Sequence, residues 1–319
     1  MIITVTMNPA IDKTVDLEHM DHGGLNRVRN VLMDAGGKGI NVSKTIKELG
    51  GETIATGFVG GSSGSYIKKV LQEQGIQPDF IETGKEVRTN LKVVEADGNV
   101  TEFNEPGPVI TSQEQEALIQ KLLSYADKDT LFVLAGSIPN GMDKDIYQVL
   151  TGKLKEKGAR VFVDADGELL IHALEAAPDI IKPNCHELEE LFHKDDRVDE
   201  EELIAMGQKL MTKGIGMIAI SLGQMGALFL TERKVLKCPG LKVEAHSTVG
   251  AGDAMVAALA YGLNQGLAFE ECARLGLAAS AGAVTTKGTK PPKRELVEEL
   301  ITKVEVITLQ YTNTGYQLI

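Results

Sequence analysis

The chain has few of the residues that mark secreted, membrane-bound or nucleic-acid-binding proteins. It contains only three cysteines and no tryptophan, and its formal net charge is −12 over 319 residues. The cysteines, at positions 185, 238 and 272, are widely spaced and lack metal-ligand spacing, which excludes a disulfide framework and indicates a reducing compartment. The negative charge argues against nucleic acid as the main partner, because lysine and arginine hold phosphate backbones.

Long apolar runs are also missing. No stretch approaches the roughly 18 residues needed to span a bilayer, and the first residues lack the charged and apolar regions of a signal peptide. We therefore predict a cytoplasmic protein without a membrane partner. An acidic chain that handles phosphates must gather cations locally, which directs attention to lysines and arginines beside glycines or polar turns.

Short apolar runs alternate with amphipathic segments along most of the chain. The runs predict strands at residues 2–7, 53–59, 131–135, 160–164, 179–182 and 217–222. The intervening segments predict helices at residues 40–49, 66–74 and 201–213. This alternation favours an α/β fold with a mostly parallel sheet covered on both faces. In such sheets ligands bind beyond the carboxyl ends of the strands.

Two segments depart from this alternation. Residues 12–34 are polar and lack a helical period, whereas residues 87–105 alternate, turn at Asp97-Gly98 and alternate again, as a β-hairpin does. If the two segments pair, they form a small separate sheet that serves as a lid or a dimer surface. An edge hairpin of the main sheet is the alternative. No linker or repeat is visible, so we expect one domain over residues 1–319 with these lid segments inserted.

The stretch "AGGKGINVSK" places three glycines around Lys38, directly before a helical pattern. The spacing of a Walker A loop is absent. Glycines here allow a hydroxylated or anionic ligand to approach the helix N-terminus closely. Lys38 would supply charge, and Asn41 an amide that both donates and accepts hydrogen bonds. A plain loop-to-helix junction explains the same residues.

Three further residues are candidates for sugar and phosphate recognition. Asp12, in "MNPAID", can accept hydrogen bonds from sugar hydroxyls, although a turn or cap aspartate is the alternative. Arg27 and Arg88 lie in the two segments that depart from the alternation. A guanidinium group suits bidentate phosphate recognition, while a solvated surface charge is the alternative for each.

Two other motifs have both a structural and a functional interpretation. Asn184 and Glu187, in "KPNCHELEEL", fit a helix capping box, and they also fit the water shell of a phosphate-bound Mg²⁺ ion. Ser221, Gly223 and Gly226, in "SLGQMGALFL", fit a nucleotide lying against a strand end. A hairpin turn explains these three residues equally well.

The stretch "STVGAGDAM" places Asp253 directly after a glycine turn and before an apolar helix. A helix N-terminus attracts anions, which the carboxylate would repel. A kinase uses both features, because backbone N–H groups stabilise the transferring phosphoryl group while the carboxylate accepts the proton of the attacking hydroxyl. A first-turn helix cap is the alternative.

Taken in order, seven motifs resemble those of the ribokinase-like, or PfkB, family of carbohydrate kinases. They are "TMNPAID", "AGGKGIN", "AGSIPNG", "VDADGE", "IKPNCHELE", "SLGQMGA" and "STVGAGDA", and the likeness extends to about residue 290. The resemblance implies a three-layer αβα sandwich with a mostly parallel sheet and a small β-sheet lid. It also implies phosphorylation of a sugar hydroxyl with ATP and Mg²⁺.

The resemblance further implies a role for each motif residue. Asp253 is the expected catalytic base, and the expected anion hole consists of Gly250, Ala251 and Gly252. The positions that match sugar or sugar-phosphate contacts are Asp12, Arg27, Gly37, Lys38, Asn41, Arg88, Asn90 and Ser137. The positions that match ATP contacts are Lys182, Asn184, Ser221, Gly223, Gly226, Thr248, Gly250 and Gly252. Glu187 is the expected magnesium-linked residue.

The opening "T-x-N-P-A-x-D" and "VRTNLK" are similar to the branch of the family that acts on phosphosugars. This implies a phosphorylated ketohexose substrate, with D-fructose 1-phosphate converted to fructose 1,6-bisphosphate as the main hypothesis. Phosphorylation of tagatose 6-phosphate is the nearest alternative, and a catalytically silent sugar-phosphate sensor is another. A nicotinamide dehydrogenase is excluded, because no G-x-G-x-x-G follows the first strand. By analogy we expect a homodimer formed through the lid.

Overall fold

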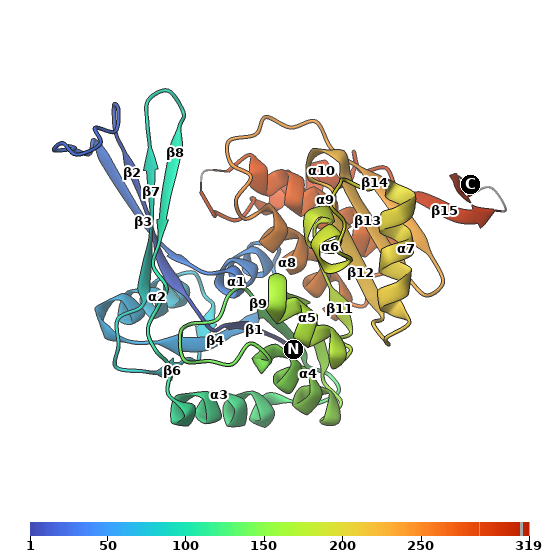
Figure 1. The fold of residues 1–319 in the computed structure, drawn as a ribbon, viewed down its shortest axis with the longest axis horizontal. Helices are drawn as coiled ribbons and strands as arrows, with labels where there is room; N and C mark the ends of the chain where they lie inside the picture. Colours follow the sequence, from blue (N-terminus) through green and yellow to red (C-terminus); the bar gives the residue numbers. More distant parts are fainter. Residues whose placement is uncertain (287, 313–314, 319) are drawn as a thin grey trace.

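The computed structural model describes residues 1–286, 288–312 and 315–318, and most of its strands belong to one twelve-stranded sheet (Figure 1). Its central strands run parallel in the order β12-β11-β10-β9-β1-β4. They are β1 (Ile2–Thr6), β4 (Thr53–Val59), β9 (Leu131–Ala135), β10 (Arg160–Asp164), β11 (Ile180–Ile181) and β12 (Met217–Ser221). The six strands predicted from the apolar runs are therefore confirmed, although β11 is shorter than expected.

Shorter and antiparallel strands extend the sheet at its two edges. Beyond β4 lie β5 (Gln77–Pro78) and β6 (Ile81–Glu82). Beyond β12 the strands are antiparallel, and they are β13 (Gly226–Thr231), β14 (Val235–Pro239), β15 (Ile307–Thr312) and β16 (Gly315–Leu318). The end of the chain, which has no clear period in the sequence, thus adds strands to this edge.

Helices cover both faces of the sheet, because successive strand side chains point to opposite sides. Phe132 and Leu134 of β9 pack into one core cluster, and Leu131 and Val133 pack into another. The first cluster is covered by α3 (Ser112–Tyr125), α4 (Ile146–Glu156), α5 (Gly167–Glu175), α6 (Cys185–Leu191) and α7 (Glu200–Met211). The second is covered by α1 (Lys38–Glu48), α8 (Ala251–Asn264), α9 (Phe269–Val284) and α10 (Arg294–Ile301). The predicted three-layer α/β fold is confirmed.

Helix α2 (Gly61–Glu73) packs separately against Ala55 and Val59 of β4, next to α1. None of the helices in the described ranges has both the length and the hydropathy needed to cross a membrane.

A second, four-stranded sheet stands off the main one in the order β3-β2-β7-β8 (Figure 1). Its strands are β2 (Ala10–Asp16), β3 (Asn30–Gly36), β7 (Arg88–Val94) and β8 (Val100–Asn104). We call it the lid sheet. The predicted hairpin is its β7–β8 pair, and the predicted pairing of the two departing segments is the parallel β2–β7 contact. The alternative of an edge hairpin on the main sheet is wrong.

The order of the main sheet places a crevice between β1 and β9. The chain passes from β1 to β4 on one side and later returns to β9 on the other side of β1. Connections therefore leave these two neighbouring strands in opposite directions, which opens a crevice at their carboxyl ends. Strand β2 starts four residues after β1 ends, and β3 leads directly into α1. Both lid connections thus join the core beside this crevice.

Candidate active site

A cavity of about 280 Å³ lies at the carboxyl ends of β1 and β9, below the lid sheet. Its lining residues are Thr6, Asn8, Gly37, Lys38, Arg88, Asn90, Asn104, Ala135, Gly136, Ser137 and Asp166. Five predicted sugar-contacting residues are among them. Four buried polar atoms of this lining have no hydrogen-bond partner among the described residues, namely Thr6 Oγ1, Asn8 Oδ1, Arg88 Nε and Asn90 Oδ1. Because buried polar atoms are normally paired, these atoms indicate a polar ligand.

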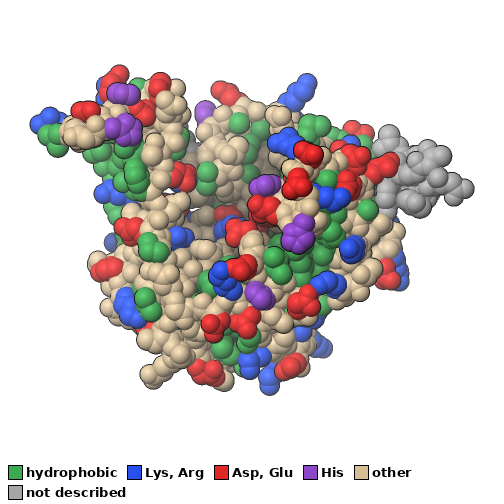
Figure 2. Space-filling model, in the orientation of Figure 1, with side chains coloured by type: hydrophobic (Ala, Val, Ile, Leu, Met, Phe, Trp, Pro, Cys, Tyr) green, Lys and Arg blue, Asp and Glu red, His purple; other side chains and the backbone are tan. Residues whose placement is uncertain are grey.

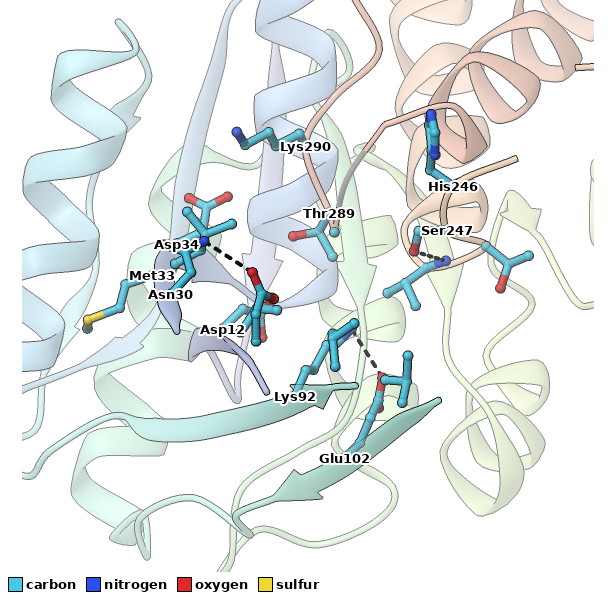
Figure 3. A pocket seen from close by; sticks show the side chains of 18 of the residues that line it. Asp12, Asn30, Met33, Asp34, Lys92, Glu102, His246, Ser247, Thr289 and Lys290 are labelled. Carbon is cyan, nitrogen blue, oxygen red and sulfur yellow. Dashed lines mark hydrogen bonds and ion pairs between the residues drawn. The ribbon is translucent and has the colours of Figure 1, made fainter. Parts of the chain in front are cut away.

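A larger groove of about 1500 Å³ adjoins this cavity and runs along the lid sheet. Figure 2 shows the hollow between the lid and the body of the molecule. Asp12 and Lys92 line its lid side, and His246, Ser247 and Thr289 line the opposite side (Figure 3). The two spaces meet at Asp12, whose Oδ1 accepts a hydrogen bond of 3.0 Å from Asn90 Nδ2. The groove is the wider opening. Lys38 lines the smaller cavity and connects it to a charged cluster of Asp164, Lys182 and Asp253, which line neither space.

Asp253 lies in the first turn of α8 and is only 8% exposed. Its Oδ2 accepts a hydrogen bond of 2.8 Å from Nδ2 of Asn41, on α1. Burial, followed by the negative charge of Asp164, raises the pKa of Asp253 to about 6, against the opposing effects of Asn41 and two lysines. A carboxyl group with this pKa is well matched to proton abstraction near neutral pH.

The glycine turn before Asp253 has the geometry of an anion site. Gly250 caps α8 with φ of 86°, in the left-handed region that favours glycine. A Cβ atom built on Gly252 would lie 3.4 Å from Lys182 Nζ, so this ammonium group sits against the first turn. The N–H groups of a first helical turn have no partner within the helix. Gly250, Ala251 and Gly252 therefore combine backbone donors with a nearby cation.

Asp164, at the carboxyl end of β10, is a site residue that the sequence analysis did not single out. Its Oδ1 lies 3.3 Å from Lys182 Nζ and 3.7 Å from Lys38 Nζ, and its Oδ2 has no described partner. Burial alone would raise the pKa of Asp164, but Lys182 and Lys38 outweigh it and lower the pKa. Asp164 in turn raises the pKa of Lys38, against desolvation. An acidic residue at the end of a parallel strand, in "VDADGE", was the available signal.

Asn184 and Glu187 form the predicted capping box of α6. Glu187 N–H donates to Asn184 Oδ1 over 2.8 Å, and Asn184 N–H donates to Glu187 Oε2 over 2.9 Å. Burial raises the pKa of Glu187, and the negative charge of Asp164 adds to the rise. The hydrogen bond from Asn184 N–H and the charge of Lys182 oppose it. The structural interpretation is thus confirmed, and it leaves Glu187 facing the charged cluster. The magnesium role of this pair stays a prediction.

Ser221, Gly223 and Gly226 form the turn between β12 and β13, as the hairpin alternative predicts. Gly226 has φ of 105°, and a Cβ atom there would lie 2.0 Å from the carbonyl oxygen of Cys238. Ser221 forms a parallel bridge with Asn184, so this turn lies at the same edge of the sheet as the other site residues. A nucleotide contact at this turn stays a prediction, as does one at Thr248, which lines the larger groove.

The two predicted phosphate-binding arginines lie apart. Arg88 borders the small cavity and donates through Nη1 to the carbonyl oxygen of Glu105 over 3.1 Å. Burial lowers its pKa. Arg27 lies exposed in the loop between β2 and β3, lines neither space, and forms no ion pair with any residue that the structure describes. Of these two arginines, Arg88 is therefore the one that can contact a ligand in the small cavity of the same chain.

Comparisons with known proteins agree with this geometry. Residues 5–296 match the pfkB family carbohydrate kinases. The chain is 37% identical over 309 residues to a 1-phosphofructokinase of Bacillus subtilis, covering 97% of this chain and all of that protein. It is 37% identical to a 1-phosphofructokinase of Borreliella burgdorferi, covering 90% of this chain and 92% of that protein.

Among solved structures, the chain is similar to the tetrameric inhibited form of phosphofructokinase-2 from Escherichia coli. The TM-score is 0.88 and the identity is 28%, covering 95% of this chain and 98% of that one. The family match spans most of the chain, as the order of the motifs predicted. The resemblance is therefore confirmed, and the chain belongs to the pfkB family of carbohydrate kinases.

Proposed function

We propose that the protein transfers the γ-phosphoryl group of ATP to the 6-hydroxyl group of D-fructose 1-phosphate. The observation that carries this proposal is the buried Asp253 carboxyl group, with a pKa of about 6, beside the glycine turn of α8. Arg88 and the unpaired polar atoms of the small cavity support a phosphorylated, hydroxyl-rich ligand. The names of the bacterial relatives support fructose 1-phosphate in particular.

In the proposed reaction, Asp253 accepts the proton of the sugar hydroxyl group, and the oxygen of that hydroxyl group attacks the γ-phosphorus of ATP. The bond between that phosphorus and the β,γ-bridging oxygen breaks, and ADP leaves with the electron pair. The N–H groups of Gly250 to Gly252 and the ammonium groups of Lys38 and Lys182 offset the charge on the transferring group. Asn41 orients the base through its hydrogen bond.

We also propose that ATP and Mg²⁺ bind along the edge formed by β11, β12 and α8. The unpaired Oδ2 of Asp164 and the carboxylate of Glu187 fit a hydrated cation. Within the described residues no three acidic, histidine or cysteine side chains gather as a protein-only metal site, so phosphates and water would complete the shell. When bound, Mg²⁺ neutralises phosphate charge. The proposed nucleotide contacts are Lys182, Asn184, Ser221, Gly223, Gly226 and Thr248.

A coupled assay of ADP release tests the proposed substrate. We expect kcat/KM for D-fructose 1-phosphate to exceed that for tagatose 6-phosphate by about 100-fold or more, because unpaired buried polar groups penalise a poorly matched sugar. Fructose 6-phosphate serves as a control for a phosphate at the opposite end. A higher kcat/KM on tagatose 6-phosphate would replace the proposed substrate, and no turnover of any sugar phosphate would favour a sensor.

The pKa of Asp253 predicts a pH profile for the same reaction. Below pH 6 the base is protonated, so kcat/KM for fructose 1-phosphate should fall about tenfold per pH unit and level off above pH 7. The phosphate of the sugar titrates in the same range. The control is Asn41→Ala, which removes a hydrogen bond that lowers the pKa of Asp253. In this variant the fall in kcat/KM should begin at a higher pH. If its position does not change, the fall is due to titration of the substrate phosphate and not of Asp253.

We propose that the protein forms a homodimer through the lid sheet. Pairing in register places Val31 and Met33 of β3 on one face with Leu91 and Phe103. Three of these four side chains are exposed, and an exposed apolar face favours association. The opposite face carries Asp12, Thr14, Asp34 and Lys92, which line the groove together with the exposed Leu32. Met33, on the edge strand β3, also borders the groove.

Analytical ultracentrifugation tests the dimer. Met33→Glu, on the apolar face, should shift the wild-type dimer to a monomer at micromolar concentration, because it buries an unpaired charge in the interface. Leu32→Glu is the matched control on the opposite face and should remain dimeric. A monomeric wild type, or equal effects of both substitutions, would contradict an interface on this face.

We further propose a cytoplasmic location. The three cysteines are unpaired, which fits a reducing compartment, and the proposed reaction consumes ATP.

A further inference from the structure

Lys44 is a buried lysine that the proposed reaction does not use. Its side chain is 1% exposed, and it lies on α1, pointing toward the strand that precedes this helix. Nζ donates to Asp34 Oδ1 over 2.8 Å and to the carbonyl oxygen of Ala35 over 2.6 Å. Lysine is almost never fully buried unless paired, because desolvating its charge is costly. Both partners of this ammonium group belong to the lid strand β3.

Asp34 belongs to a row of polar residues that crosses the lid sheet. The register aligns Asp34 of β3 with Asp12 of β2, Asn90 of β7 and Asn104 of β8. Residues aligned in this way share one face of a sheet. Asn90 and Asn104 line the small cavity, and Asp12 is hydrogen-bonded to Asn90. Lys44 therefore holds one end of the row that borders the proposed sugar site.

The charges of this row require a cation. Asp12 and Asp34 lie directly opposite each other on neighbouring strands, where like charges destabilise a sheet. Burial raises the pKa of Asp12, as does the charge of Asp34, whereas Asn90, Lys92 and Lys44 oppose this shift. Among these, Lys44 alone contacts Asp34. Removing Lys44 would leave two opposed carboxyl groups beside the substrate without the cation that contacts Asp34.

Helix α1 also connects Lys44 to the reacting groups. Its first residue, Lys38, faces Asp164, and Asn41 holds Asp253. Lys44 follows three residues after Asn41, so the three side chains project from successive turns of one helix. About one helical turn thus separates the residue that holds the base from the residue that holds the lid strand.

We propose that Lys44 is a positioning residue that fixes the sugar-binding row of the lid sheet relative to helix α1 and thereby relative to the base. This inference rests on the proposed sugar-phosphate kinase function. It predicts that Lys44 acts on sugar affinity and on the ordering of the lid, with little effect on nucleotide affinity.

The test compares Lys44→Met with the matched control Lys121→Met. Lys121 is a less deeply buried lysine with a similar set of partners. It is bonded to Asp79 Oδ1 over 2.6 Å and to two carbonyl oxygens, but it lies on α3 away from the lid. We expect Lys44→Met to raise KM for fructose 1-phosphate about tenfold or more, with KM for ATP and kcat nearly unchanged. Lys44→Arg should restore most of the affinity, and Lys121→Met should change stability alone.

The pH dependence separates positioning from general destabilisation. In Lys44→Met the pKa of Asp12 should rise, so KM for the sugar phosphate should begin to worsen at a higher pH than in the wild type as the pH is lowered. The substrate phosphate titrates in both proteins, so the pH dependence of KM in the wild type is the reference for the variant. Lys44→Arg, which keeps the cation, should follow the wild type.

Hydrogen exchange of the free protein gives a readout that does not depend on activity. Lys44→Met should exchange the amides of residues 30–36 about tenfold faster than the wild type, and Lys121→Met should not. If the wild type does not phosphorylate fructose 1-phosphate, the proposed function fails while this measurement still decides the role of Lys44. Unchanged exchange together with an unchanged sugar KM, at a lowered melting temperature, would overturn the proposal.

A charge-neutral variant covers the case in which Lys44→Met does not fold. Lys44→Met combined with Asp34→Asn removes the unpaired carboxylate. It should fold, exchange the amides of residues 30–36 faster and keep a raised sugar KM, but lose the extra pH dependence. Wild-type behaviour of this double variant would overturn the proposal.

Discussion

Asp253→Asn should lower kcat by about 10³-fold, because the variant retains the shape of the side chain but has no group that accepts the proton of the attacking hydroxyl. The amide oxygen can still accept the hydrogen bond from Asn41. The geometry of α8 should therefore persist, and the Kd for ATP should change less than threefold. Single-turnover phosphoryl transfer, measured beside calorimetric ATP binding, checks this split. Turnover near the wild-type level would remove Asp253 as the base.

The same variant should be more stable than the wild type. The folded-state pKa of Asp253 is raised to about 6, so its favourable contribution to folding is complete at low pH and is lost as the pH rises through 6. A shift of this size corresponds to about 2–3 kcal/mol in the free energy of unfolding. Asparagine avoids the penalty, so Asp253→Asn should unfold at a higher denaturant concentration at pH 7.5 and at nearly the wild-type concentration at pH 4. A loss of stability at both pH values would contradict the conclusion that burying the charged Asp253 carboxylate destabilises the fold.

Arg88→Met should lower kcat/KM for fructose 1-phosphate about 100-fold, because a charged hydrogen bond contributes about 1.5–3 kcal/mol and Arg88, which lines the cavity, has a buried Nε without a described partner. The loss should depend on the phosphate of the substrate. With unphosphorylated fructose, the residual turnover of Arg88→Met should match that of the wild type within threefold. Arg88→Lys should fall between the two, since an ammonium group cannot form the bidentate contact.

Arg160→Met is the control for this second experiment. Arg160 lies at the amino end of β10, whereas the site lies at the carboxyl ends of the strands. Its removal should leave kcat/KM for both sugars unchanged. Equal losses on fructose and fructose 1-phosphate in Arg88→Met would show that Arg88 supports the lid and does not read the phosphate.

Most of the main sheet could be predicted from the sequence, because its parallel strands are short apolar runs with few competing interpretations. Runs such as Leu131–Ala135 and Arg160–Asp164 are buried from both sides, which leaves no polar alternation to mislead the prediction. The lid was also predictable, since the alternation around Asp97-Gly98 has the period of a hairpin. The added strands β13 to β16 were less evident, because β13 follows a turn and β15 and β16 lie in a segment of the sequence without a clear period.

The site was predicted as a set of positions but not as a network. Motif spacing places Asp253 and Lys38 near the ends of helices, yet it cannot show that Asp164 stands between Lys38 and Lys182. Such contacts depend on which strands are neighbours. In the same way, the sequence grouped Arg27 with Arg88 because both lie in lid segments. The structure separates them, because the loop after β2 extends away from the core while β7 begins beside it.

The contact between Asn41 and Asp253 has a consequence for synthesis of the chain. The two residues are 212 positions apart, and the helices that carry them pack on each other in the same core cluster. On the ribosome, α1 emerges long before α8, so Val42 and Ile46 lack the apolar partners that α8 supplies until more than 200 further residues have been added. Nascent chains with uncovered apolar faces are prone to aggregate. Release from the ribosome, and protection by chaperones until then, should therefore limit the yield of active protein.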